Sequence, residues 1–387
     1  MRSALLFFVA LPIALVTTSA LTGCGDDSSS GGGGAGGEAG TGGIGTEGPI
    51  NAPEGEWTWV PFPGTQCMDG SETGFAINRN GANDDVVIFL EGGNACFNFG
   101  SCASTANPDG YDAEKFAAQG ADDVGRYPYL DRTNPDNPYK DMSFVYVPYC
   151  SGDLHAGDRE GVTVANVERQ FKGYSNMSAF LERLVPTFSG AQRVVLTGIS
   201  AGGFGATLNY DHVASAFGAE VDTILMDDSG PLLSAPYAPE CLQQHFYDTW
   251  GYADTIAADC PDCQEGNFTE AFIEHLLGKY PDARLGLISS AEDATITNLL
   301  GFGLDDCVNL QTSPLDYDLA QYTAGLEDLR DRVAAGSSGF RLFLIPGDEH
   351  VFLDNALGSV NQDGTALTDW IEQALTGDAA WANVPAP

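Results

Sequence analysis

Apolar and polar residues alternate along this chain on a repeated plan, in which a short β-branched run ends in a loop rich in glycine or acidic residues. The apolar runs are 86–90, 144–147, 194–196, 223–226, 285–288 and 340–345. Between them lie segments such as 176–188 and 268–277, whose mixed polarity suits amphipathic helices. This alternation predicts an α/β fold with a mostly parallel central sheet covered by helices on both faces. In such a sheet, chemistry sits in the loops after the carboxyl ends of the strands.

The loop after run 194–196 has the pattern of a nucleophilic serine. The segment RVVLTGISAGGFG leads from a strand through Gly198-Ile-Ser-Ala-Gly202 into a helix-compatible stretch. Glycines are needed there because the chain reverses within one residue while strand and helix pack closely, so Ser200 is predicted to be strained and exposed. The alternative is a glycine-rich turn whose serine only caps the helix. We interpret Ser200 as the nucleophile.

A serine hydroxyl needs a base, and five histidines are available. His350 follows the last strong strand in the loop PGDEHVF, where the α/β-hydrolase order of serine, acid and histidine places the base. His155 ends a strand loop and could line the cleft, but it precedes the serine. His212 and His275 are expected on helix surfaces, and His245 has no strand in front of it. The sequence therefore favours His350 as the base.

Acidic residues that could orient the base follow three strands. They are Asp227 and Asp228, then Glu292 and Asp293, then Asp348 and Glu349. The expected position lies after the strand that precedes the histidine strand, which selects Asp293 over Glu292. The alternative role for Asp228 is to fix its own loop by accepting backbone N–H groups.

Acyl transfer also requires donors for the developing oxyanion. Glu91-Gly-Gly-Asn94 follows run 86–90 and is similar to the glycine-rich oxyanion loops of esterases. The backbone N–H groups of Gly93, Asn94 and Ala201 are the expected donors, since glycine allows close approach of backbone to substrate. The alternative is a simple turn.

The N-terminal region predicts export. Residues 1–23 read as a secretory signal, because the apolar run 4–16 is shorter than the ~20 residues of a spanning helix. The sequence Leu-Thr-Gly-Cys24 resembles a bacterial lipobox, which predicts an acylated Cys24 and a cell-envelope or surface anchor; a soluble secreted protein with a stray cysteine is the alternative. Residues 24–56 are rich in Gly and Ser and predict a flexible tether. Residues 57–387 are expected to form a single catalytic domain.

Eight cysteines remain beside Cys24, and an even number in an exported chain predicts disulfides. The local pairs Cys96 with Cys102 and Cys260 with Cys263 are the simplest expectation, while the spacing leaves the connectivity of the others open. Cys260-Pro-Asp-Cys263 is half of a zinc motif without its second half, so we expect no metal and no other cofactor. The eight residues are Cys67, Cys96, Cys102, Cys150, Cys241, Cys260, Cys263 and Cys307.

The net charge limits the partners. The formal charge is −38 for the whole chain, and −39 without Arg2 of the signal. Such a surface repels nucleic acid and anionic membranes, so we expect no nucleic-acid partner and membrane contact only through the N-terminal lipid. Adaptation to salt is the alternative reason for this acidity.

Five ordered motifs resemble the pectin acetylesterase family, which includes the Notum-type carboxylesterases. They are CMDGSETGF from Cys67, FLEGGNAC from Phe89, VPYCSGD from Val147, GISAGG from Gly198 and DSG from Asp228. The resemblance runs from about Cys67 to His350 and implies an α/β-hydrolase fold, ester hydrolysis by a metal-free serine mechanism, and acetyl as the common acyl group.

The resemblance also implies roles for individual residues. It suggests that Cys67 pairs with Cys150. Asn94 stands where the family commonly carries a Trp that lines the acyl pocket, which implies a smaller and polar wall here. The residues that it supports for catalysis are Ser200, Asp293 and His350, with Gly93, Asn94 and Ala201 as oxyanion donors.

The sequence thus predicts a monomeric, lipid-anchored serine carboxylesterase that removes acyl groups, chiefly acetyl, from a polysaccharide or another ester. Pectin is a polyanion to which so acidic a chain offers no long-range attraction, so a neutral acetylated glycan fits the charge at least as well. Two alternatives remain: a non-catalytic surface lipoprotein that uses a hydrolase fold for binding or adhesion, and a peptidase on the same fold.

Overall fold

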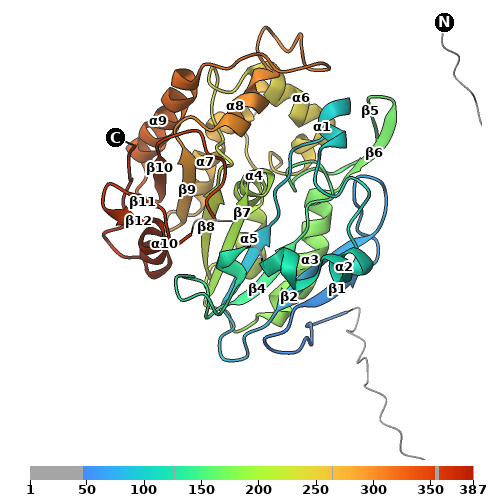
Figure 1. Cartoon of the computed structure of the whole chain (residues 1–387), viewed down its shortest axis with the longest axis vertical. Helices are drawn as coiled ribbons and strands as arrows, with labels where there is room; N and C mark the ends of the chain where they lie inside the picture. Colours follow the sequence, from blue (N-terminus) through green and yellow to red (C-terminus); the bar gives the residue numbers. More distant parts are fainter. Residues whose placement is uncertain (1–46, 126, 264, 354–356, 387) are drawn as a thin grey trace, which may run out of the picture. The chain divides into compact units, whose positions relative to one another are not determined.

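A computed structural model describes residues 47–125, 127–263, 265–353 and 357–386 (Figure 1). The predicted signal, Cys24 and the first part of the predicted tether lie outside these described residues. Within them, no helix combines the length and the apolar character that crossing a membrane demands.

An eight-stranded sheet in the order β1-β2-β4-β3-β7-β8-β9-β10 forms the centre of the fold. Strand β2 runs antiparallel to both of its neighbours, and every other pair in this sheet is parallel. The mostly parallel sheet predicted from the apolar runs is therefore confirmed. The strands are β1 (Thr58–Phe62), β2 (Thr73–Asn78), β3 (Val86–Leu90), β4 (Ser143–Val147), β7 (Arg193–Ile199), β8 (Asp222–Asp228), β9 (Arg284–Ser290) and β10 (Phe340–Ile345).

Helices flank this sheet, and two small hairpins lie outside it. The hairpins are β5 (Arg159–Val164) with β6 (Val167–Phe171), and β11 (Asn361–Gln362) with β12 (Thr365–Ala366). The helices are α1 (Phe99–Ala103), α2 (Ala113–Gly125), α3 (Gly173–Thr187), α4 (Ala201–Leu208), α5 (Tyr210–Phe217), α6 (Glu240–Trp250), α7 (Phe268–Lys279), α8 (Ala294–Gly301), α9 (Leu319–Gly336) and α10 (Leu367–Thr376).

Strand β3 shows how one apolar run serves both faces of the sheet. Val86, Ile88 and Leu90 join the core that contains residues of α3, α5, α7 and α9. Val87 and Phe89 join the core with α2 and α10. Successive side chains of a strand point to opposite faces, so a run buried on both sides is apolar throughout. The predicted helical cover on both faces is confirmed.

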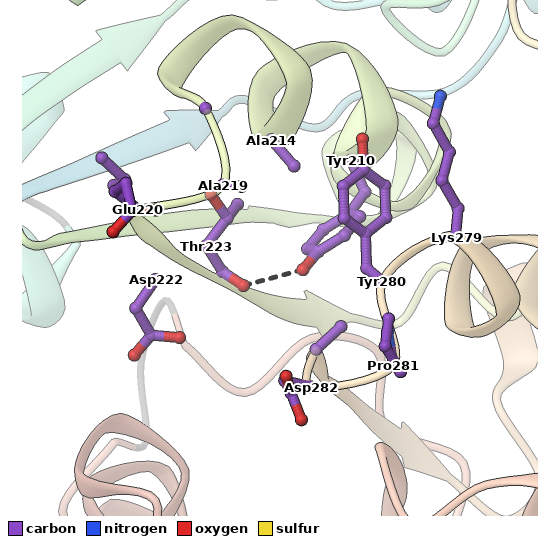
Figure 2. A pocket seen from close by; sticks show the side chains of 13 residues that line it. Tyr210, Ala214, Ala219, Glu220, Asp222, Thr223, Lys279, Tyr280, Pro281 and Asp282 are labelled. Carbon is purple, nitrogen blue, oxygen red and sulfur yellow. Dashed lines mark hydrogen bonds between the residues drawn. The ribbon is translucent and has the colours of Figure 1, made fainter.

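A pocket of about 360 Å³ lies at the amino end of β8 (Figure 2). Tyr210 Oη donates to the carbonyl of Thr223 across it at 2.7 Å. Asp222, which lines the pocket, is ion-paired with Arg284. The loops with the predicted catalytic residues follow the carboxyl ends of the strands. This pocket therefore lies at the opposite end of the strands from those loops.

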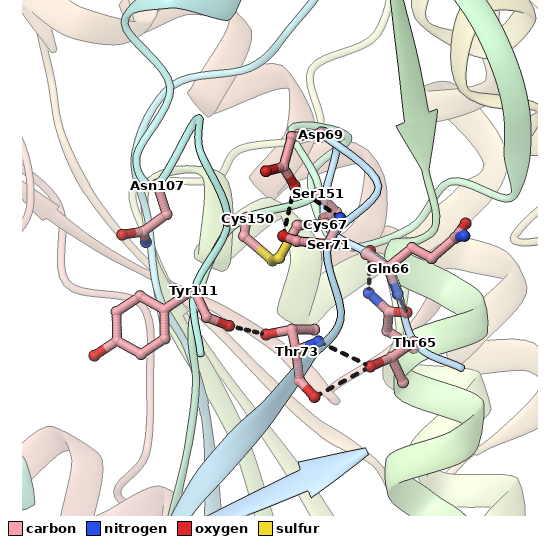
Figure 3. Close-up of a disulfide and its surroundings, with 12 residues drawn as sticks. Thr65, Gln66, Cys67, Asp69, Ser71, Thr73, Asn107, Tyr111, Cys150 and Ser151 are labelled. Atoms are coloured by element: carbon pink, nitrogen blue, oxygen red, sulfur yellow. Dashed lines mark hydrogen bonds between the residues drawn. A yellow bond between two sulfur atoms is a disulfide. The ribbon is translucent and has the colours of Figure 1, made fainter. Parts of the chain in front are cut away.

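Four disulfides fix loops around the sheet. The expected local pairs Cys96–Cys102 and Cys260–Cys263 are confirmed, so Cys260 and Cys263 present no thiolate to a metal. The pair Cys67–Cys150, implied by the resemblance, is also confirmed and joins the segment before β2 to the loop after β4 (Figure 3). The fourth pair, Cys241–Cys307, joins α6 to the loop after α8. Disulfides of this number fit an oxidising compartment outside the cytosol.

Residues shortly before position 57, at the end of the predicted tether, pack against the domain. Ile50 and Ala52, which the sequence places in the tether, are buried in the core. The amide of Ile50 donates to Thr187 Oγ1 at 2.7 Å, and Arg183 Nε donates to the carbonyl of Gly48 at 3.1 Å. These contacts fix the end of the predicted tether against helix α3.

Candidate active site

Ser200 occupies a strained turn between β7 and α4. Its backbone has φ 55° and ψ −120°, in the left-handed region that disfavours side chains. Its N–H donates to the carbonyl of Asp228 at 2.7 Å. A Cβ at Gly198 would lie 2.3 Å from the Gly202 carbonyl oxygen, and one at Gly202 would lie 2.0 Å from that of Leu90. Crowding therefore explains both glycines. The turn is strained as predicted, but Ser200 is half-buried and not exposed.

A half-buried His350 and a buried Asp293 form a pair beyond the carboxyl ends of β9 and β10. His350 Nδ1 lies 2.7 Å from Asp293 Oδ2, and Asp293 is fully buried. The other carboxylate oxygen of Asp293 accepts the amides of Thr295 and Ile296 at 2.9 Å each, so Asp293 also caps helix α8. Glu292 is exposed. The choice of Asp293 over Glu292 as the partner of His350 agrees with this geometry.

The pair also defines the state of the imidazole. A carboxylate that accepts from Nδ1–H leaves Nε2 with a free lone pair, which is the tautomer that a general base requires. Among the described residues, Nε2 of His350 is buried and has no hydrogen-bond partner. The ring is therefore held from one side and presents its basic nitrogen on the other.

Two hydrogen bonds join the end of β9 and the loop after it to the loop after β10. The amide of Ala294 donates to the carbonyl of Asp348 at 3.1 Å, and Ser290 Oγ donates to the carbonyl of Glu349 at 2.5 Å. Asp348 and Glu349, two of the six acidic candidates, thus contribute carbonyl groups that hold the loop of His350.

The predicted oxyanion loop lies directly against the serine turn. A Cβ at Gly92 would lie 2.4 Å from the carbonyl oxygen of Ile199 and 3.1 Å from Cβ of Ser200. Glu91 anchors the loop from below, since its Oε2 accepts the amide of Tyr149 at 2.9 Å. Only glycine permits so close an approach of the two loops.

The three predicted oxyanion donors belong to the two segments that make this contact. Gly93 has φ 136° and Asn94 has φ 65°, while Ala201 is the first residue of α4. Among the backbone hydrogen bonds of the described residues, none is donated by these three N–H groups. They are available to a ligand, as an oxyanion hole requires.

Ser200, Ala201 and Asn94 line a pocket of about 230 Å³. Helices α1, α4 and α8 form its walls, and none of the residues that line it is charged. Its other lining residues are Ala95, Phe97, Asn98, Gly100, Ser101, Ser104, Leu154, Phe204, Thr295, Ile296, Asn298, Leu299, Phe302 and Thr312.

A smaller, apolar cavity of about 50 Å³ adjoins this pocket. The two share four apolar residues, namely Leu154, Phe204, Ile296 and Leu299. Leu208, Leu232, Leu233, Ala238, Leu242, Phe246, Phe268 and Leu300 are the other apolar side chains beside it, with Pro231. An apolar cavity therefore lies behind these four side chains of the serine pocket.

The other histidines differ in burial. His155 is only 3% exposed, its Nε2 lies 2.8 Å from the carbonyl oxygen of Glu91, and burial lowers its pKa to about 4. His212 is half-buried on α5, where Tyr174 of α3 stacks on its ring with 4.2 Å between the ring centroids. His275 is half-buried on α7.

Asp228 has a role that the sequence did not reveal. Its Oδ2 accepts the amides of Phe352 and Leu353 at 2.7 Å each. These groups belong to the loop of His350, so the expectation that Asp228 fixes its own loop is wrong. Asp227 points elsewhere and accepts from Thr207 Oγ1 at 2.7 Å.

Together, the eight-stranded sheet, the strained serine turn and the pair of Asp293 and His350 define a chain of the α/β-hydrolase class. The profile of the pectinacetylesterase family matches residues 60–301, and the chain belongs to this family. The family resemblance read from the motifs is thereby confirmed. The matched range includes Ser200 and Asp293 and ends before His350.

Relatives from animals and plants are similar to different extents of the chain. The palmitoleoyl-protein carboxylesterase NOTUM of Homo sapiens is 32% identical over 162 residues, which cover 38% of this chain and 29% of that protein. The NOTUM protein of Drosophila melanogaster is 29% identical over 187 residues, which cover 46% of this chain and 28% of that protein. Pectin acetylesterase 11 of Arabidopsis thaliana is 24% identical over 319 residues, which cover 79% of this chain and 78% of that protein. The chain thus matches less than a third of the length of the NOTUM proteins.

Proposed function

We propose that this chain is a serine carboxylesterase. The observation that carries the proposal is the pair of His350 and the buried Asp293, whose Nδ1 and Oδ2 atoms lie 2.7 Å apart, in a chain whose Ser200 occupies a strained turn. An imidazole held by a carboxylate, with its second nitrogen free, is the arrangement that activates a serine hydroxyl. Family membership supports the same class of reaction.

The proposed reaction has two stages. Ser200 Oγ attacks the ester carbonyl while its proton passes to Nε2 of His350, and the N–H groups of Gly93, Asn94 and Ala201 bind the oxyanion. When the tetrahedral intermediate collapses, the C–O bond to the alcohol breaks and the alcohol leaves with the proton from Nε2. Water then attacks the acyl-enzyme with His350 as base, and the carboxylic acid is released.

A neutral acetylated glycan is the substrate class that we favour. The pocket beside Ser200 offers no lysine or arginine to a uronate, and the chain as a whole carries a formal charge of −38. A polyanion therefore gains nothing from this surface at long range.

The salt dependence of turnover tests this preference. We expect kcat/KM for acetylated pectin to rise with added salt, because repulsion is screened within a Debye length of about 10 Å at 0.1 M. The value for neutral acetylated xylan should change little over the same range. Strong pectin hydrolysis that weakens with salt would instead require a basic cleft and would contradict the proposal.

Acetyl is the acyl group that family membership favours, but the apolar cavity supports longer acyl esters as a second candidate. Burial of each methylene in such a space contributes about 0.8 kcal/mol, so a chain that fills it gains affinity with length. Rates on p-nitrophenyl acetate, butyrate and octanoate, measured beside acetylated xylan and pectin, separate the two candidates. Maximal kcat/KM on acetate supports acetyl, and maximal kcat/KM on octanoate supports the longer acyl group.

A substitution that fills the apolar cavity tests whether a longer acyl chain binds there. Ala238 borders the apolar cavity but not the serine pocket. If the cavity takes the acyl chain, Ala238→Leu should lower kcat/KM for octanoate about tenfold and leave acetate unchanged, since the added side chain displaces about two methylene groups of the acyl chain. Ala214→Leu is the matched control, because Ala214 is similarly buried but lines the pocket of Figure 2. An equal loss on both esters would exclude the cavity as an acyl site.

We also propose that the chain is exported and anchored by lipid at Cys24, which lies outside the described residues. The lipobox-like sequence before Cys24 and the four disulfides support export. The native protein should partition into detergent, whereas Cys24→Ser should be released or retained as precursor. Intact-mass analysis that finds an unmodified N-terminus elsewhere would remove the anchor.

A further inference from the structure

Asp228, the last residue of β8, contacts both of the loops that the proposed mechanism must bring together. Its carbonyl oxygen accepts the amide of Ser200 at 2.7 Å. Its side chain accepts the amides of Phe352 and Leu353, which follow His350 by two and three residues, at 2.7 Å each. One residue therefore bonds the backbone of the nucleophile and the backbone behind the base.

We propose that Asp228 is a positioning residue that holds the loop of His350 in register with the turn of Ser200. The inference rests on the proposed function, because that function makes His350 the base. Asp293 bonds the imidazole ring itself, whereas Asp228 acts through the backbone on which the ring is mounted. Asp293 thus orients the imidazole, and Asp228 fixes the position of the backbone that carries it.

The backbone after His350 needs such support. Val351 has φ 63°, a left-handed conformation that is a genuine outlier for a β-branched residue. Its amide donates to Ser229 Oγ at 3.3 Å, and that hydroxyl donates to Asp228 Oδ1 at 3.0 Å. Strain of this kind persists only where surrounding bonds fix it. Asp228 thus fixes three consecutive amides, two directly and one through Ser229.

The surroundings of Asp228 favour strong and specific bonds. The residue is fully buried, and this desolvation raises its pKa to about 6, against the lowering effect of the Phe352 and Leu353 amides, Ser229 and His350. Other titratable groups that interact with it are Asp227 and Tyr139. Hydrogen bonds to an ionised acceptor in a buried site are roughly twice as strong as neutral ones.

Two substitutions separate positioning from other roles. Asp228→Ala removes the acceptor, and a displaced base is expected to lower kcat about 100-fold with KM nearly unchanged. Asp228→Asn keeps an amide oxygen that can accept the same N–H groups, so most of the turnover should return. An alanine variant with wild-type kcat, or an asparagine variant as impaired as the alanine variant, would overturn the proposal.

Amide hydrogen exchange tests the contact without relying on esterase activity. In Asp228→Ala, exchange at Phe352 and Leu353 should accelerate at least tenfold, because their acceptor is lost. Asp227→Ala is the matched control, since it removes a buried carboxylate from the adjacent position that bonds Thr207 and Gly230. Unchanged exchange in the Asp228 variant, or equal acceleration in both variants, would overturn the positioning role. An inactive wild-type enzyme would instead overturn the proposed function.

Discussion

Ser200→Ala is expected to reduce ester hydrolysis by about 10⁶-fold while the fold is retained. Nucleophile, base and acid act as a unit, so the loss of one removes most of their joint effect. For the same reason, His350→Ala should be about as damaging, and the double variant should be no worse than either single variant. The measurements are kcat on p-nitrophenyl acetate and the melting temperature, with circular dichroism to confirm the fold.

Ser215→Ala provides the control for this substitution. Ser215 is an exposed serine on α5, and its loss should leave kcat unchanged. Wild-type turnover in folded Ser200→Ala would remove Ser200 from the mechanism. It would also favour the alternative in which the turn serves only to connect β7 and α4.

Asp293→Asn is expected to lower kcat by about 10⁴-fold. An asparagine that places its NH₂ group toward His350 stabilises the imidazole with its proton on Nε2, and this tautomer cannot accept the proton of Ser200. The second carboxylate oxygen, which caps α8, can be replaced by the amide oxygen, so stability should fall by much less than activity.

Glu292→Gln is the matched control for the acid. Glu292 is adjacent in sequence but exposed, so its neutralisation should change kcat less than twofold. Equal losses in the two variants would mean that the assignment of the acid is wrong. Comparison with Asp228→Asn then distinguishes the residue that holds the ring from the residue that holds the loop.

The parts of the site that could be predicted from sequence depend on local constraints. The turn at Ser200 is encoded by glycines that crowding requires, and the apolar runs mark buried strands directly. Strand order then placed Asp293 and His350 in neighbouring loops, because parallel strands end at the same edge of the sheet. These features follow from short segments and from one topological rule.

The parts that could not be predicted depend on contacts between distant segments. Asp228 and Leu353 are 125 residues apart, and no pattern near either residue signals their bond. His212 is covered by Tyr174 of another helix, which helical periodicity alone does not reveal. Likewise, Ile50 follows a glycine-rich stretch, yet it is buried because the core against α3 accepts one more apolar side chain. Tertiary packing decides all three.

The disulfide between Cys96 and Cys102 makes one wall of the serine pocket depend on the redox state of the compartment in which the chain folds. Helix α1, which forms one wall of the serine pocket, is five residues long and too short to persist alone. This disulfide closes the segment around it, and Trp250 Nε1 donates to the Cys96 carbonyl at 3.0 Å. The central sheet is stabilised by its own core. A chain produced in a reducing cytosol would lack the Cys96–Cys102 bond together with the other three disulfides, so an inactive preparation from that compartment would not show that the serine site is non-catalytic.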